Sequence, residues 1–202
     1  MAISLEKGKK VHLEKKSNAG LGEILVNLNW NTKPAKQGFL AGLLGSKSSG
    51  IDLDLGCLYE LKNGQKGAIQ ALGNAFGSLQ REPYIALDGD DRTGAVATGE
   101  NLRIDGNRIC EIKRVLVYTF IYEGVANWQQ ADATVTIHYP GAEDLIVKMD
   151  TYNSSDIMCG LVLLENLNDE TFSVEKIVQF YQGHQALDRA FHWGLRWTAG
   201  RK

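Results

Sequence analysis

Carboxylate side chains are concentrated in two short stretches of this chain, and their spacing suits the binding of a hard cation. The first stretch covers residues 51–55, where Asp52 and Asp54 alternate with apolar residues. Alternate residues of a β-strand point to the same face, so we expect the two carboxylates side by side. Such a pair in an apolar strand is costly unless a cation neutralises it or the pair faces solvent.

The second stretch is a glycine-rich loop between residues 88 and 101. Its candidate ligands are four carboxylates and one amide: Asp88, Asp90, Asp91, Glu100 and Asn101. Glycines at positions 89, 94 and 99 permit positive φ angles that turn carbonyl groups inward. Calcium takes about six to eight oxygens in irregular geometry, whereas magnesium demands a near-ideal octahedron. The loop therefore predicts a calcium site together with Asp52 and Asp54. The alternative is a solvated turn whose aspartates cap backbone amides.

Composition and charge exclude several other classes of protein. The chain has 202 residues, 44% of them hydrophobic and 23% charged, which is ordinary for a globular protein. A net charge of -2 predicts no nucleic-acid partner. The sequence shows no signal peptide and no apolar run near about 18 residues, which favours a cytoplasmic protein. Cys57, Cys110 and Cys159 are far apart and have apolar neighbours, so we expect three inert core thiols rather than a zinc site.

Alternating apolar and polar residues predict many short strands. The expected strands are residues 24–30, 51–59, 68–72, 115–122, 133–139, 145–149, 158–165 and 172–181. The Asn63-Gly64 pair is typical of a tight hairpin. Helical spacing from Leu187 to Leu195 indicates the one expected helix. Together these patterns predict an all-β fold, an antiparallel two-sheet β-sandwich with a short C-terminal helix, as a single domain over residues 1–202.

Residues 31–50 are rich in glycine, serine and lysine, which predicts a flexible insertion between two strands. Their apolar tip, residues 39–44, is flanked by Lys33, Lys36 and Lys47. One interpretation is a loop that folds back onto the domain. The other is contact of this tip with a partner or with an anionic membrane surface.

Catalytic motifs are absent from the sequence. The four histidines lack ligand-like spacing, no nucleophile elbow occurs, and no dinucleotide fingerprint follows a strand. A metal acting as Lewis acid in an enzyme is the weakest alternative, because no nucleophile is paired with a base. Trp193 and Trp197 lie among Arg189, Arg196 and two further basic residues at the C-terminus. That basic aromatic tail indicates either core packing with solvated charge or contact with an anion or partner.

Four segments, residues 3–8, 26–30, 51–54 and 90–94, occur in the same order as in the TerD family of tellurium-resistance and stress-response proteins, which the chain resembles over nearly its whole length. Residues 54–61 and 193–197 are most similar to the TerA branch of that family. The resemblance implies a calcium-binding β-sandwich without established enzymatic activity.

One segment departs from the family's pattern. Residues 95–101 read Ala-Val-Ala-Thr-Gly-Glu-Asn where the family typically has a Gly-Asp-Gly-Asp-Asp-Glu run. We therefore expect one ion, or weaker binding, rather than a two-ion site. The leading hypothesis is a non-catalytic scaffold or assembly component in tellurite resistance, with other stress-response or tellurium-resistance proteins as partners. Calcium-dependent binding to anionic lipid is the alternative.

Overall fold

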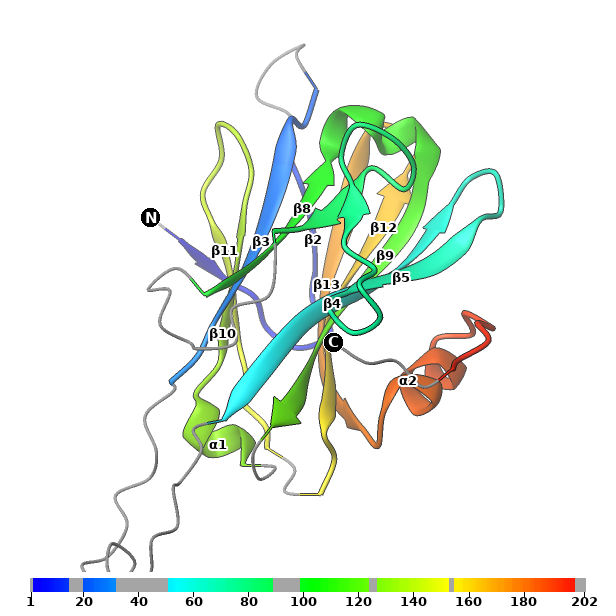
Figure 1. The fold of residues 1–202 in the computed structure, drawn as a ribbon. Coiled ribbons are helices and arrows are strands. Elements are labelled where there is room, and N and C mark those ends of the chain that lie inside the picture. The colour runs from blue at the N-terminus through cyan, green and yellow to red at the C-terminus, as the bar shows by residue number, and fades with distance from the viewer. Residues whose placement is uncertain are drawn as a thin grey trace, which may run out of the picture.

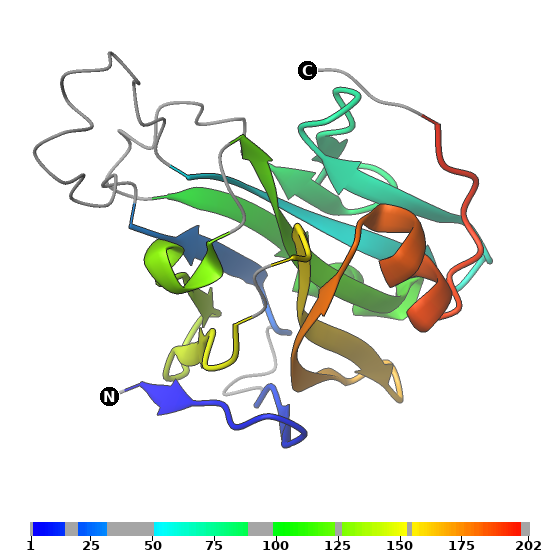
Figure 2. The ribbon, with the colours of Figure 1, turned by 90° about the horizontal axis from the view of Figure 1, so that it is seen from below.

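The computed structural model describes residues 2–14, 20–31, 51–88, 99–123, 127–152 and 155–198. Within these residues the strands form two sheets that lie face to face (Figure 1 and Figure 2). Sheet A contains, in spatial order, β1 (Ile3–Ser4), β11 (Leu145–Lys148), β10 (Thr134–His138), β3 (Glu23–Asn29), β8 (Glu100–Asp105), β7 (Ile85–Leu87) and β6 (Gly77–Ser78). Sheet B contains β2 (Lys10–His12), β13 (Thr171–Tyr181), β12 (Met158–Leu167), β9 (Ile112–Glu123), β4 (Asp52–Leu61) and β5 (Lys66–Gln70).

The predicted antiparallel sandwich is confirmed. Neighbouring strands pair antiparallel, apart from β1, which pairs parallel to β11. The Asn63-Gly64 pair connects β4 to β5, and Gly64 has a φ of 89°, a left-handed conformation that glycine adopts without strain. Strand β9 lies between β4 and β12, and its residues from Val115 to Ile121 are buried on both faces.

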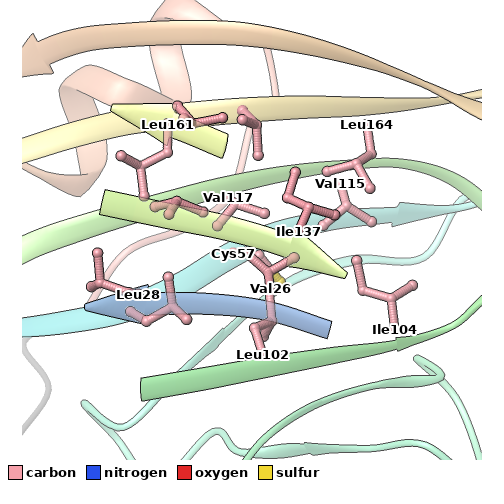
Figure 3. Close-up of a cluster of buried hydrophobic side chains, with 14 of the residues drawn as sticks. Val26, Leu28, Cys57, Leu102, Ile104, Val115, Val117, Ile137, Leu161 and Leu164 are labelled. Atoms are coloured by element: carbon pink, nitrogen blue, oxygen red, sulfur yellow. The ribbon is translucent and has the colours of Figure 1, made fainter. Parts of the chain in front are cut away.

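The main core fills the space between the two sheets (Figure 3). It forms because apolar residues alternate along the longer strands and point inward. Ten fully buried members are Val26, Leu28, Cys57, Leu102, Ile104, Val115, Val117, Ile137, Leu161 and Leu164. These side chains come from β3, β8 and β10 of sheet A and from β4, β9 and β12 of sheet B. The core therefore holds both sheets together and fixes the ends of β4 and β8 relative to each other.

A second apolar cluster covers the outer face of sheet B. Helix α2 (His184–Ala190) and the segment after it pack there (Figure 2). The buried members are Leu58, Leu116, Tyr118, Phe120, Met158, Tyr181, Leu187 and Trp193. The helix is shorter than the spacing up to Leu195 predicted. The chain leaves the helix at Phe191, and Gly194 has a φ of 76°.

Two short helical turns were not predicted. They are a 3-10 segment, η2 (Gly106–Glu111), and α1 (Trp128–Ala131). The expectation of a single helical segment is wrong because turns this short contain too few residues to show a helical period. The insertion predicted at residues 31–50 lies, apart from Asn31, outside the described residues and stays a prediction.

The cysteines are only partly as expected. Cys57 and Cys159 are free and buried, and burial raises the pKa of both thiols well above the usual value. Cys110 is exposed, so its prediction as a core thiol is wrong. In η2 the neighbouring side chain of Ile109 is buried instead. None of the helices in the described ranges is long and apolar enough to cross a membrane.

Candidate metal site

The first acidic stretch forms the beginning of β4. Leu53 and Leu55 point into the core between the sheets, whereas Asp54 lies on the opposite side of the strand. Asp54 is nonetheless only 1% exposed, and Asp52 is half-buried. Strand β5 pairs with β4 from Gly56 onward, and the pairing with β9 shifts register between Asp52 and Leu53. Among the described strands, the first residues of β4 therefore present an edge that β5 does not cover.

Glu100, the first residue of β8, reaches this edge from the other sheet. Its Oε2 accepts a hydrogen bond from the backbone N–H of Leu55 at 2.5 Å, and its side chain is 2% exposed. A strand's N–H points sideways, in the plane of its sheet, so the carboxylate lies at the edge of β4. Oε2 of Glu100 is thus hydrogen-bonded to the peptide group between Asp54 and Leu55. Two acidic segments that are 45 residues apart in the sequence meet here.

A buried tyrosine, Tyr118, lies close to Asp54. Burial, first of all, and then the nearby Cys57 and Asp54 raise the pKa of Tyr118 well above its usual value. Burying a carboxylate is costly unless hydrogen bonds or a cation compensate for its lost hydration. Asp54 and Glu100 are therefore groups whose charged forms a divalent cation would stabilise.

Two other candidate ligands lie on the outer face of sheet A. The carboxylate of Asp88 accepts hydrogen bonds from Nε and Nη2 of Arg103, both at 2.6 Å. The same guanidinium forms an ion pair with Glu23, and together the two carboxylates raise the pKa of Arg103 above its usual value. The side chain of Asn101 accepts a hydrogen bond from Nδ2 of Asn27 at 2.8 Å.

Strand alternation separates Asn101 from Glu100. Neighbouring residues of a strand point to opposite faces, and the burial of β8 alternates in the same way. The candidates that the structure describes therefore form two groups. Asp52, Asp54 and Glu100 lie at β4, whereas Asp88 and Asn101 lie with Arg103 on the outer face of sheet A.

Asp90 and Asp91 lie outside the described residues, but both ends of their loop are described. The N–H of Asp88 donates to the carbonyl oxygen of Asn101 at 3.0 Å, which joins the two ends. Gly99 has a φ of 65°, and a Cβ there would lie 2.0 Å from the carbonyl oxygen of Leu28. This position therefore requires glycine, as the sequence indicated.

The described residues alone do not complete a metal site. Within them, no three His, Cys, Asp or Glu side chains are close enough together to hold an ion. The oxygens at β4 are hard donors of the type that calcium prefers. They fit such an ion only if further ligands come from another segment, and residues 89–98 directly precede Gly99 and Glu100.

Sequence reasoning missed Arg103 as the partner of Asp88. Asn101 and Arg103 are two residues apart in β8, so both point to the same face of the strand, and this spacing could have indicated that Arg103 lies near the candidate ligands. It also missed a polar cluster on the outer face of sheet B, where Gln70 joins His184 and Tyr118. Gln70 and His184 are 114 residues apart, and no local pattern predicts such a contact.

The fold described above is that of the antiparallel two-sheet β-sandwiches. The model of the TerD domain matches residues 1–139, and the chain belongs to the TerD family. It is 43% identical over 201 residues to the tellurium resistance protein TerA of Alcaligenes sp, covering 99% of this chain and 58% of that protein. It is 38% identical over 136 residues to the stress response protein SCP2 of Bacillus subtilis (strain 168), covering 64% of this chain and 65% of that protein. The chain thus spans less than two thirds of the length of either relative.

Solved structures share the fold. A homologue of telluride resistance protein (TerD) from Streptomyces coelicolor A3(2) superposes with a TM-score of 0.55 at 16% identity, covering 84% of this chain and 95% of that one. The unknown function protein SAV2460 superposes with a TM-score of 0.60 at 14% identity, with the same coverage of both chains. At these identities the likeness concerns the fold alone. The predicted membership of the TerD family is therefore confirmed by the family match and by the relatives.

Proposed function

We propose that this protein is a calcium-binding sandwich that acts as a non-catalytic scaffold or assembly component in bacterial tellurite resistance and stress response. The observation that carries the proposal is the contact of the Glu100 carboxylate with the backbone of β4, next to the buried Asp54. The tellurium-resistance and stress-response names of its relatives supply the biological setting.

The physical argument starts from two carboxylates held in a poorly hydrated place. At short range their charges repel each other, and the low dielectric of a protein interior strengthens that repulsion. A divalent ion between them would turn repulsion into attraction. In the proposal, Asp52, Asp54 and Glu100 supply ligands from β4 and β8, and Asp90 and Asp91 supply the remainder from the loop.

Asp88 and Asn101 have a supporting role in this scheme. Asp88 already shares both oxygens with Arg103, and Asn101 is bonded to Asn27. Their contacts join β7, β8 and β3 at the base of the loop. In this proposal Asp88 and Asn101 position the loop, and they are not among the calcium ligands that we favour.

A scaffold needs a surface that partner proteins can recognise. Calcium bound at β4 would attach the loop between β7 and β8 to the other sheet, so the shape of this end of the sandwich would depend on calcium. An ion that binds only the folded state also stabilises it, by about 2.7 kcal/mol when its concentration is a hundredfold above Kd. Partner binding and stability are then linked to the same ion.

Calorimetry with protein freed of metal tests the proposal. At near-neutral pH we expect a saturable heat of calcium binding, and Asp54→Asn should weaken the affinity by at least about tenfold. The matched control is Asp144→Asn, which removes the charge of a half-buried aspartate that pairs with His138. If wild-type protein gives no heat with calcium and no change in thermal unfolding, the proposal is wrong.

Calcium-dependent attachment to anionic lipid stays a prediction. The residues that motivated it, 39–44 with their flanking lysines, lie outside the described residues. Co-sedimentation with phosphatidylserine liposomes tests it, since a scaffold should stay in the supernatant with or without calcium.

A further inference from the structure

A surface hollow of about 540 Å³ opens beside α2, far along the chain from the acidic stretches. Its wall includes two apolar side chains, Leu72 and Trp197, and polar side chains of Gln182, Gln185 and Arg189. Small-molecule sites typically measure about 300–1,000 Å³ and combine an apolar wall with a few polar groups. The hollow has the size and the mixed lining of such a site.

Trp197 is held in place by a buried carboxylate. Its indole Nε1 donates to Oδ2 of Asp188 at 2.9 Å. The same carboxylate accepts hydrogen bonds from the backbone N–H groups of Gly194 and Leu195, at 2.7 and 2.9 Å. Asp188 is only 4% exposed, and its three hydrogen bonds hold the segment after α2 against the helix. The flat ring of Trp197 therefore forms a pre-positioned wall.

His184 contributes a neutral ring to the same hollow. Its Nε2 lies 2.8 Å from Oε1 of Gln70, which also accepts the hydroxyl proton of Tyr118 at 2.6 Å. A carbonyl oxygen only accepts, so the Nε2 of His184 carries the proton. Burial lowers the pKa of His184 to about 4, and the ring is uncharged at neutral pH. Its ring also lies 4.9 Å from that of Trp197, centroid to centroid.

Arg189 is the one formal charge among the residues that line the hollow. The lining contains no carboxylate, and among the residues described Arg189 forms no ion pair. A guanidinium recognises a carboxylate through two parallel hydrogen bonds, and an indole face packs against a flat ring. Arg189 and Trp197 line the same hollow, so the hollow combines a group that binds carboxylates with a surface that packs against flat rings.

We propose that this hollow binds a small organic carboxylate with a flat apolar body, with Arg189 binding the carboxylate and Trp197 contacting the body. The two glutamine side chains would donate or accept further hydrogen bonds at the rim. The proposal does not depend on calcium, since none of the lining residues belongs to the candidate metal site.

Benzoate and benzamide distinguish a charge-dependent site from a general apolar surface. Both are flat and similar in size, but only benzoate carries a carboxylate. In ¹H–¹⁵N NMR titrations we expect benzoate to shift the backbone amides of residues 183–189 and the indole N–H of Trp197 saturably. Benzamide should bind about tenfold more weakly, because a charge-assisted contact is lost.

Two arginine variants complete the test. Arg189→Gln should weaken benzoate about tenfold and leave benzamide unchanged. Arg196→Gln removes an exposed arginine seven positions away that does not line the hollow, and both probes should bind it as they bind wild type. Equal affinity of wild type for the two probes would overturn the proposal. It would also be overturned by an absence of saturable shifts at the hollow, or by an equal loss in both variants. The wild-type comparison decides the matter even if Arg189→Gln does not fold.

Discussion

Replacing Glu100 by glutamine separates the charge of this side chain from its hydrogen bond. Glutamine is almost the same size and can still accept the N–H of Leu55, the contact that Oε2 now makes at 2.5 Å. In metal-free protein the change relieves a buried charge and weakens one charge-assisted hydrogen bond. These effects oppose each other, so we expect the free energy of unfolding to change by only about 1 kcal/mol.

Calcium should reveal the difference between the two side chains. At a concentration a hundredfold above the wild-type Kd, calcium should stabilise wild type by about 2.7 kcal/mol. If Glu100→Gln raises Kd tenfold, the same calcium concentration stabilises the variant by only about 1.4 kcal/mol. For a chain of this size a difference near 1.3 kcal/mol corresponds to roughly 3–5 °C in Tm.

Urea unfolding with a chelator measures the effect of the substitution on the metal-free protein, and urea unfolding with calcium measures the increment that calcium adds to the free energy of unfolding. Glu170→Gln is a suitable control, because Glu170 is exposed in the turn between β12 and β13. That variant should gain the full wild-type increment from calcium. If Glu100→Gln also gains the full increment, Glu100 is not a ligand and the reasoning about β4 is refuted.

Three further predictions concern other parts of the molecule. The folded pKa of His184, about 4, is below the usual value near 6.5, so the unfolded state takes up a proton first as pH falls. As pH falls from about 6.5 to 4, the free energy of unfolding should therefore decrease by up to about 3 kcal/mol. His184→Gln should reduce this pH dependence in urea titrations, and an unchanged dependence in the variant would contradict the assignment. Gly99→Ala should destabilise by more than about 2 kcal/mol in thermal or urea unfolding, since its φ is 65° and its Cβ would meet a backbone oxygen of β3 at 2.0 Å. In native protein a thiol reagent should label Cys110 rapidly and Cys57 and Cys159 only on unfolding; rapid labelling of all three would show that the buried pair is accessible.

The strands were predictable because their signals are local. Apolar alternation fixes which residues of a strand face the core, and a pair such as Asn63-Gly64 determines a hairpin within a few residues. The same alternation correctly separated Asp54 from Leu53 and Leu55 on β4. These features depend only on neighbours in the sequence.

The contacts that build the candidate site were not predictable in this way. Glu100 meets β4 because β8 lies in sheet A and its first residue reaches across to sheet B. The contact of Arg103 with both carboxylate oxygens of Asp88, a predicted ligand, was not foreseen either. Both outcomes depend on how the two sheets are stacked, and a period of two residues carries no information about stacking.

A crystal structure of the protein grown with calcium is the most direct measurement of whether β4 and the loop share an ion. Our account predicts an ion about 2.3–2.6 Å from carboxylate oxygens of Asp54 and Glu100, with further ligands from Asp90 or Asp91. A calcium-saturated structure with no ion at these two side chains, or with the loop aspartates turned away from β4, would contradict it.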